Sequence, residues 1–205
     1  MIDLPKLLRE LAKKRPVFHS EADMQHELAM QIGKTYPRFS IRLEYPMDNN
    51  TAIDIVIFND GRKMALELKY LCRHLEHDIN GEKFKLINQD AYNNRRYDVM
   101  KDIWRMEKFL EKHPAATADV LVVTNDPAYW EGPYKRNTHD AAFAIKKNRV
   151  VKGTLKWKSP ETKGNRGEEI QLRGEYSIKW QKYSNIKDID NGYFKFLHIQ
   201  LNAGL

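Results

Sequence analysis

Cysteine is almost missing from this sequence, since Cys72 is the only one in 205 residues. One cysteine cannot form an internal disulfide, and it cannot build a zinc site from cysteine ligands. The composition therefore fits a reducing compartment, and we expect a cytoplasmic protein. His74 and His77 leave a cysteine nucleophile as an alternative, although all three residues belong to one charged local segment.

Long apolar runs are missing as well. No stretch approaches the roughly 18 apolar residues of a membrane-spanning helix, and residues 1–16 lack the apolar segment of a signal peptide. We therefore expect no membrane partner. The chain contains no internal repeat or low-complexity tract, and 41% of its residues are hydrophobic. That is enough for one core, so we expect a single domain over residues 1–205.

Positive charge is concentrated near the C-terminus. Residues 131–205 hold 15 Lys and Arg against 8 Asp and Glu, whereas residues 1–130 hold 20 of each, so the net charge of +7 arises entirely in the last part. Aromatic residues alternate with the basic ones there, a mixture that suits phosphates and unstacked bases. The alternative is that the basic side chains only solvate antiparallel strands. The candidate nucleic-acid contacts are Lys156, Lys158, Lys163 and Arg166.

Two apolar runs, residues 52–58 (AIDIVIF) and 63–70 (KMALELKY), are joined by four residues that include Gly61. A short glycine-containing link between such runs predicts a β-hairpin. If Phe58 pairs with Lys63, the numbers of opposed residues sum to 58 + 63 = 121. The same sum then identifies every other pair of facing residues in the hairpin.

Asp54 and Glu67 also sum to 121, so we expect these carboxylates to face each other. Opposed residues lie roughly 5 Å apart at Cβ, and the two-residue period of a strand puts Lys69 on the same face. Opposed like charges destabilise a sheet unless a positive group lies between them. A divalent cation meets that need, because Mg²⁺ commonly binds through one or two carboxylates. The alternative is a pair of acids salt-bridged to Lys69 and Arg62 on a wet sheet face.

This constellation resembles the motif of the PD-(D/E)xK nuclease superfamily, here of a bacterial-type branch. Asp54, Glu67, Leu68 and Lys69 match the motif, while Ile53 stands where many members have proline. The resemblance implies a restriction-endonuclease-like fold and a Mg or Mn ion. It also implies Asp54, Glu67 and the Leu68 carbonyl as metal ligands, with Lys69 assisting the nucleophile.

A further acid lies on a predicted helix that begins at Ser20 and ends at Gly33. At about 100° per residue, Glu21 points to the middle of the apolar stripe of this helix, with Gln25 beside it. A carboxylate on a core-facing stripe needs a partner. Many superfamily members have a glutamate there that reaches the metal site, which implies Glu21 as a catalytic residue and Gln25 as a supporting one. A favourable interaction with the helix dipole is the alternative explanation.

From Ser20 to residue 125 the predicted elements follow the order helix, three strands, helix, strand. Further periodic segments lie before and after them. Besides the hairpin and the helix that begins at Ser20, we expect a helix over 2–14, a strand over 39–45, a charged loop over 71–85, a helix over 88–112, a buried strand over 118–125, a helix over 139–147, and strands over 149–157, 169–180 and 193–202. We expect an α/β (α+β) fold with a mixed central sheet. Residues 1–130 form the predicted αβββαβ catalytic core, and residues 131–205 a basic antiparallel β extension.

The second long helix carries polar residues of its own. Gln89 resembles a glutamine of recombination nucleases in the superfamily, although its spacing differs, so it is a candidate supporting residue. Asp98, Asp102 and Arg105 lie on one side of the helix, and we interpret them as an intrahelical charge network. Glu107 lies on the buried side, where we expect an arginine partner.

The resemblance implies a metal-dependent phosphodiesterase that hydrolyses DNA. A non-catalytic nucleic-acid-binding module on the same fold is the alternative from another class, because a fold does not determine a function. An enzyme that acts on RNA or another phosphodiester would share the same site. A homodimer is also left open by the sequence.

Overall fold

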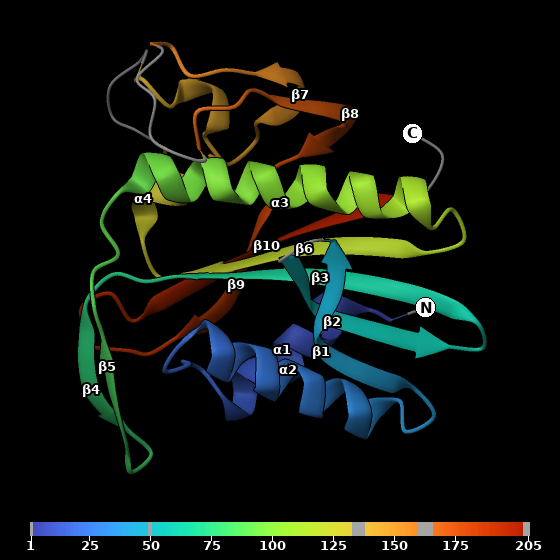
Figure 1. Ribbon diagram of the computed structural model, residues 1–205. Coiled ribbons are helices and arrows are strands. Elements are labelled where there is room, and N and C mark those ends of the chain that lie inside the picture. The colour runs from blue at the N-terminus through green and yellow to red at the C-terminus, as the bar shows by residue number, and fades with distance from the viewer. Residues whose placement is uncertain (1, 49–50, 133–137, 160–165, 203–205) are drawn as a thin grey trace.

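The computed structural model describes residues 2–48, 51–132, 138–159 and 166–202. Its centre is a mixed sheet of six strands, shown in Figure 1. In spatial order these are β1 (Ser40–Asp48), β2 (Thr51–Asn59), β3 (Arg62–Leu71), β6 (Thr117–Thr124), β10 (Tyr193–Asn202) and β9 (Trp180–Asn185). Strands β3 and β6 run parallel, whereas the other neighbours are antiparallel. The predicted mixed central sheet is therefore confirmed.

Helices cover both faces of this sheet. Helices α1 (Leu4–Lys14) and α2 (Glu21–Thr35) lie on one face and α3 (Tyr92–Lys112) on the other (Figure 1). The short α4 (Pro127–Trp130) follows β6. Ser20 caps α2 by accepting the Asp23 N–H, as predicted. The helix continues past Gly33, because the Tyr36 N–H still donates to the Ile32 carbonyl.

Each face of the sheet has its own core. Leu66 and Leu68 of β3 pack with α1 and α2, whereas Ala65 belongs to the core on the α3 side. Because alternate residues of a strand face opposite sides, Glu67 and Lys69 point towards α3. Strand β6 is buried along almost its whole length, which confirms that it is covered on both faces.

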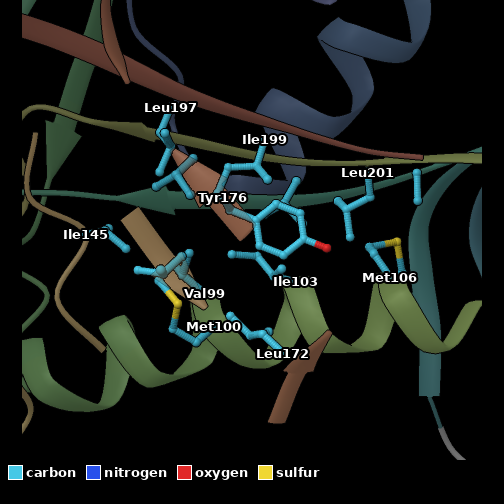
Figure 2. Close-up of a cluster of buried hydrophobic side chains, with 14 of the residues drawn as sticks. Val99, Met100, Ile103, Met106, Ile145, Leu172, Tyr176, Leu197, Ile199 and Leu201 are labelled. Atoms are coloured by element: carbon cyan, nitrogen blue, oxygen red, sulfur yellow. The ribbon is translucent and has the colours of Figure 1, made fainter. Parts of the chain in front are cut away.

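The C-terminal part contributes to two layers. Strands β7 (Val150–Leu155) and β8 (Ile170–Ser177) pair as a separate sheet on the outer side of α3, while β9 and β10 belong to the central sheet (Figure 1). Figure 2 shows that apolar side chains of α3, β8 and β10 pack together in one cluster. Helix α3 is therefore packed on two sides, which holds it firmly against the sheet.

The helix predicted over residues 139–147 is wrong. Only Ala141–Phe143 form a single 3₁₀ turn, and Ala144 is already extended. The guanidinium group of Arg149 donates to the carbonyls of Ala141, Ala142 and Ala144. These carbonyls therefore have side-chain partners and do not need a helical ladder.

Further elements differ from the predictions. The strand predicted over 169–180 is interrupted, since β8 ends at Ser177 and β9 begins at Trp180. The segment over 71–85 contains a hairpin of β4 (Leu75–Ile79) and β5 (Glu82–Leu86), turned by Asn80 and Gly81 with positive φ. Such an Asn-Gly turn is a hairpin signal. Helix α3 begins at Tyr92 and not at residue 88, because Ala91 before it adopts a left-handed conformation. Residue Gln89 consequently lies in a loop.

Glu107 attaches the outer sheet to α3. Its buried carboxylate accepts the N–H groups of Arg173 and Gly174 at 2.8–3.1 Å and the Tyr176 hydroxyl at 2.7 Å. The pairing of β7 with β8 shifts register there, which frees these N–H groups. The expected arginine partner is therefore wrong, since the Arg173 guanidinium group pairs with the exposed Glu111.

We predict that Glu107→Gln lowers the free energy of unfolding by about 2–4 kcal/mol, because the three hydrogen bonds to Oε1 lose their charged acceptor and the amide NH₂ group replaces Oε2, which accepts the Arg173 N–H. Glu111→Gln, one turn further along α3, is the matched control and should change the free energy of unfolding far less, because the ion pairs of Glu111 are exposed to solvent. Urea denaturation followed by tryptophan fluorescence measures both. Equal losses of stability in the two variants would contradict the role assigned to Glu107.

Candidate active site between β2, β3 and α3

The β2–β3 hairpin has the predicted register. Phe58 pairs with Lys63 and Ile55 with Leu66, so opposed residue numbers sum to 121. The described pairing ends at Ile55 and Leu66, one step before the two acids. The strands therefore separate at the level where the sequence places the carboxylates.

Carboxylates replace β2 as partners of β3 beyond this point. The Leu68 N–H donates to Asp54 Oδ2 at 2.6 Å, and the Tyr70 N–H donates to Glu21 Oε2 at 2.7 Å. These N–H groups lie on the same strand edge as that of Leu66, which faces β2. Buried N–H groups need acceptors, so the separation of the strands fixes Asp54 and Glu21 in place.

Lys69 is held as a cation. Its Nζ lies 2.9 Å from Asp102 Oδ2 on α3 and 3.0 Å from the Leu68 carbonyl oxygen. Burial alone lowers the pKa of this ammonium group, but the charges of Asp102, Glu21 and Asp54 outweigh it and raise the pKa above its ordinary value. Lys69 can therefore donate hydrogen bonds and stabilise negative charge, and it keeps its proton at neutral pH.

Arg105 of α3 covers Glu67. Its Nη2 donates to the Ala52 carbonyl at 2.6 Å and lies 3.1 Å from Glu67 Oε1, while Nη1 lies 3.5 Å from Asp102 Oδ1. The Glu67 side chain is only 2% exposed, and that of Arg105 is 20% exposed. The contact with Glu67 lacks hydrogen-bond geometry, so this buried carboxylate oxygen has a charge partner but no hydrogen bond.

The site holds more negative than positive charge. Its carboxylates are Glu21, Asp54, Glu67 and Asp102, and the cations paired with them are Lys69 and Arg105. With all four acids ionised, these six side chains carry a formal charge of −2, and Glu44 is not included in this count. Burial raises the pKa of all four acids, and for Glu67 the charges of Asp102 and Asp54 add to this rise.

Gln25 of α2 holds the backbone of Asp54, and Glu44 of β1 lies beside it. Gln25 Nε2 donates to the backbone carbonyl of Asp54 and to Glu44 Oε1, each at 2.7 Å. Leu43 of β1 pairs with Ile55 and Tyr45 with Ile53, which places Glu44 opposite Asp54. The φ angle of Glu44 is 49°, in the left-handed region. Gln25 thus has a supporting position, and Glu44 is a neighbouring acid that the sequence analysis missed.

The sequence analysis also did not identify Asp102 and Arg105 as residues of the site. It interpreted them as part of an intrahelical charge network, and that interpretation is only partly correct. They do face each other, but their closest ionic partners lie on β3, at Lys69 and Glu67. Asp98 does not join them. It forms a bidentate ion pair with Arg166 at 2.7 and 3.0 Å.

The remaining candidates lie outside the acid cluster. Gln89 donates through Nε2 to the Tyr70 carbonyl at 3.2 Å and through its N–H to the Cys72 carbonyl at 2.9 Å, so it supports the end of β3. Burial raises the pKa of the Cys72 thiol to about 12. An activated thiol needs a lowered pKa, so this environment opposes a cysteine nucleophile.

Four basic residues are the predicted nucleic-acid contacts, namely Lys156, Lys158, Lys163 and Arg166. Lys163 lies outside the described residues. Lys156 is exposed and lies 2.7 Å from Glu169, while Arg166 is tied to Asp98 of α3. Of these residues, Arg166 is therefore held against α3, at Asp98, one turn before Asp102.

An open groove of about 410 Å³ leads to Lys69. It is lined by the start of β2 and one side of α3, through Thr51, Ala52, Lys69, Asp98, Lys101, Asp102 and Arg105. Lys69 is therefore accessible from outside, whereas Glu67 lies behind Arg105. A phosphate in the groove could reach the lysine directly.

The donor set fits a hard divalent cation, although its oxygens are already engaged. Among the residues that the structure describes, no group of three or more His, Cys, Asp and Glu side chains is arranged as a metal site. Asp54 accepts an N–H group, and Glu67 is paired with Arg105. Carboxylates, the Leu68 carbonyl and a surplus of −2 are nevertheless what Mg²⁺ or Mn²⁺ requires.

Comparisons with protein-family models, curated proteins and solved structures give no match to this chain. In the described ranges, no helix has the length and apolar character that crossing a membrane requires. The chemistry of the site is therefore inferred from its own residues.

The raised pKa values predict that the acid cluster lowers the free energy of unfolding by an amount that depends on pH. A carboxyl group with a higher pKa in the folded state lowers stability increasingly as pH rises from its ordinary pKa to its folded pKa. In the absence of metal, Glu67→Gln should therefore stabilise the protein at pH 8 by about 1 kcal/mol or more. This gain should shrink as pH falls towards 4.5, the ordinary pKa of Glu67.

Thermal unfolding of both proteins across this pH range measures the effect. Glu10→Gln is the control, because Lys13 lowers the pKa of Glu10 and the pH dependence should have the opposite sign. A Glu67→Gln variant that is less stable at pH 8 than at pH 5, relative to the parent, would show that the cluster is not strained by its charge.

Proposed function

We propose that the protein is a metal-dependent phosphodiesterase that hydrolyses DNA, with a restriction-endonuclease-like core of the PD-(D/E)xK type. The surplus charge of −2 beside an open groove carries this proposal, because one divalent cation would neutralise it. The order α2, β1, β2, β3, α3 and β6 is consistent with the αβββαβ arrangement of that superfamily.

Asp54, Glu67 and the Leu68 carbonyl are the groups that would hold Mg²⁺ or Mn²⁺. When bound, such an ion makes water a stronger nucleophile at neutral pH and neutralises charge on a phosphate. Asp54 is oriented for this role by the Leu68 N–H, and Gln25 fixes its backbone.

Lys69 would stabilise negative charge that develops on the phosphate. It is protonated, accessible from the groove, and oriented by Asp102 and the Leu68 carbonyl. Charged donors that are held in place before the reaction need no reorganisation, which is why they stabilise transition states well. Glu21 adds negative charge near Lys69 and holds the Tyr70 N–H, so it positions the end of β3.

A non-catalytic nucleic-acid-binding module is the second candidate. One observation favours it, namely that Arg105 already neutralises Glu67. If this ion pair is permanent, Glu67 needs no metal ion as a counter-charge. The two candidates differ in whether DNA is cleaved in the presence of Mg²⁺. An enzyme acting on RNA would be distinguished by substrate competition.

Lys69→Met separates these functions, because it keeps the apolar stem and removes the ammonium group. We expect Mg²⁺-dependent DNA cleavage to fall by roughly 10²-fold or more, with Mn²⁺ binding retained. Lys63→Met is the matched control, since Lys63 lies on the same strand and, an even number of residues from Lys69, on the same face of the sheet. Cleavage that persists at the parent rate in Lys69→Met would leave Lys69 as a salt-bridge residue only.

DNA affinity should depend on the basic residues that follow β7. We expect the double variant Lys156→Gln and Lys158→Gln to bind DNA more weakly, with the log–log salt slope reduced by about one unit for each phosphate that the protein no longer neutralises. The control is Lys13→Gln with Lys14→Gln, at the exposed end of α1 beyond the opposite face of the sheet. Filter binding over a salt series measures the slopes, and an unchanged slope in the first variant places the DNA elsewhere.

A further inference from the structure

We infer that Arg105 is an exchangeable counter-ion. It neutralises Glu67 in the metal-free protein, and it turns into the groove to bind a phosphate of the substrate when a divalent cation takes its place. This inference rests on the proposed function and goes beyond it, because Arg105 matches no position of the motif.

The contacts of Arg105 are unequal. Its bond to the Ala52 carbonyl is short, at 2.6 Å, whereas its contact with Glu67 Oε1 is 3.1 Å and lacks hydrogen-bond geometry. Charge-assisted pairs of arginine with a carboxylate are normally bidentate and well aligned. The guanidinium group therefore supplies charge to Glu67 without a directed bond, an interaction that another cation can replace.

The position of Arg105 makes such an exchange necessary. Arg105 lines the groove and is 20% exposed, whereas the Glu67 side chain is 2% exposed and does not line the groove. An ion that enters from the groove reaches Glu67 only after the guanidinium group moves aside. Two cations in contact with one carboxylate oxygen would also repel each other.

The groove offers the displaced guanidinium group a place beside the substrate. Thr51, Lys101 and Lys69 line the same space and would act as donors to a phosphate. The two acids that also line it are already paired, Asp98 with Arg166 and Asp102 with Lys69. The planar fork of arginine matches two phosphate oxygens at once, which a lysine cannot do. The same side chain would thus stabilise the acids before metal binding and the phosphate after it.

Calorimetric titration with Mn²⁺ and DNA binding in saturating Mn²⁺ test this exchange together. For Arg105→Gln we expect Mn²⁺ to bind about tenfold more tightly, because the positive charge that competes with the ion for Glu67 is removed. DNA affinity, measured in a Lys69→Met background to suppress cleavage, should fall by about tenfold. A purely structural arginine would not change the two affinities in opposite directions.

Arg173→Gln is the matched control, because Arg173 pairs with a glutamate as Arg105 does, here Glu111 of α3, and lies away from the acid cluster. It should leave Mn²⁺ affinity unchanged. Arg105→Lys provides a second variant that keeps the charge and a donor for the Ala52 carbonyl, and its Mn²⁺ affinity should lie between those of the parent and Arg105→Gln. Unchanged or weaker Mn²⁺ binding in Arg105→Gln overturns the exchange.

Asp54→Asn distinguishes failure of this inference from failure of the proposed function. If the parent binds no Mn²⁺, or if Asp54→Asn binds it as well as the parent, the proposed metal site is wrong. If Asp54→Asn abolishes Mn²⁺ binding and Arg105→Gln leaves it unchanged, the metal site stands and only the exchange is wrong.

Discussion

The separation of β2 from β3 after the Ile55–Leu66 pair is the constraint on which the site depends. It leaves two N–H groups of β3 without a strand partner, and the carboxylates of Asp54 and Glu21 accept them. Buried acids then require cations, which β3 supplies as Lys69 and α3 as Arg105. The packing of α3 between the central sheet and β7–β8 holds this helix in place.

Much of this arrangement follows from local rules. A four-residue turn and the two-residue period of a strand determine the register of the hairpin as far as Ile55 and Leu66. Spacing therefore placed Asp54 and Glu67 at the end of this ladder, but it did not reveal that the strands separate before the two acids pair. The stripe of α2 likewise pointed Glu21 at the core. In each case short-range geometry limits where the side chain can lie.

The remaining features depend on contacts distant in the chain. Asp102 and Arg105 have a sufficient local explanation as helix neighbours, and nothing in their spacing reveals that β3 supplies their partners. The missing helix around Ala141–Phe143 has a similar cause, because Arg149 binds the carbonyls that a helix would have used. Tertiary contacts outweighed local propensity in both places.

Anomalous diffraction from a crystal soaked in Mn²⁺ tests the central claim most directly, because it locates the ion and its ligands without reference to activity. The account predicts a Mn²⁺ peak in contact with the carboxylates of Asp54 and Glu67, with the guanidinium group of Arg105 turned away from Glu67. A crystal with no peak at these carboxylates, and with the pair between Arg105 and Glu67 unchanged, would contradict it.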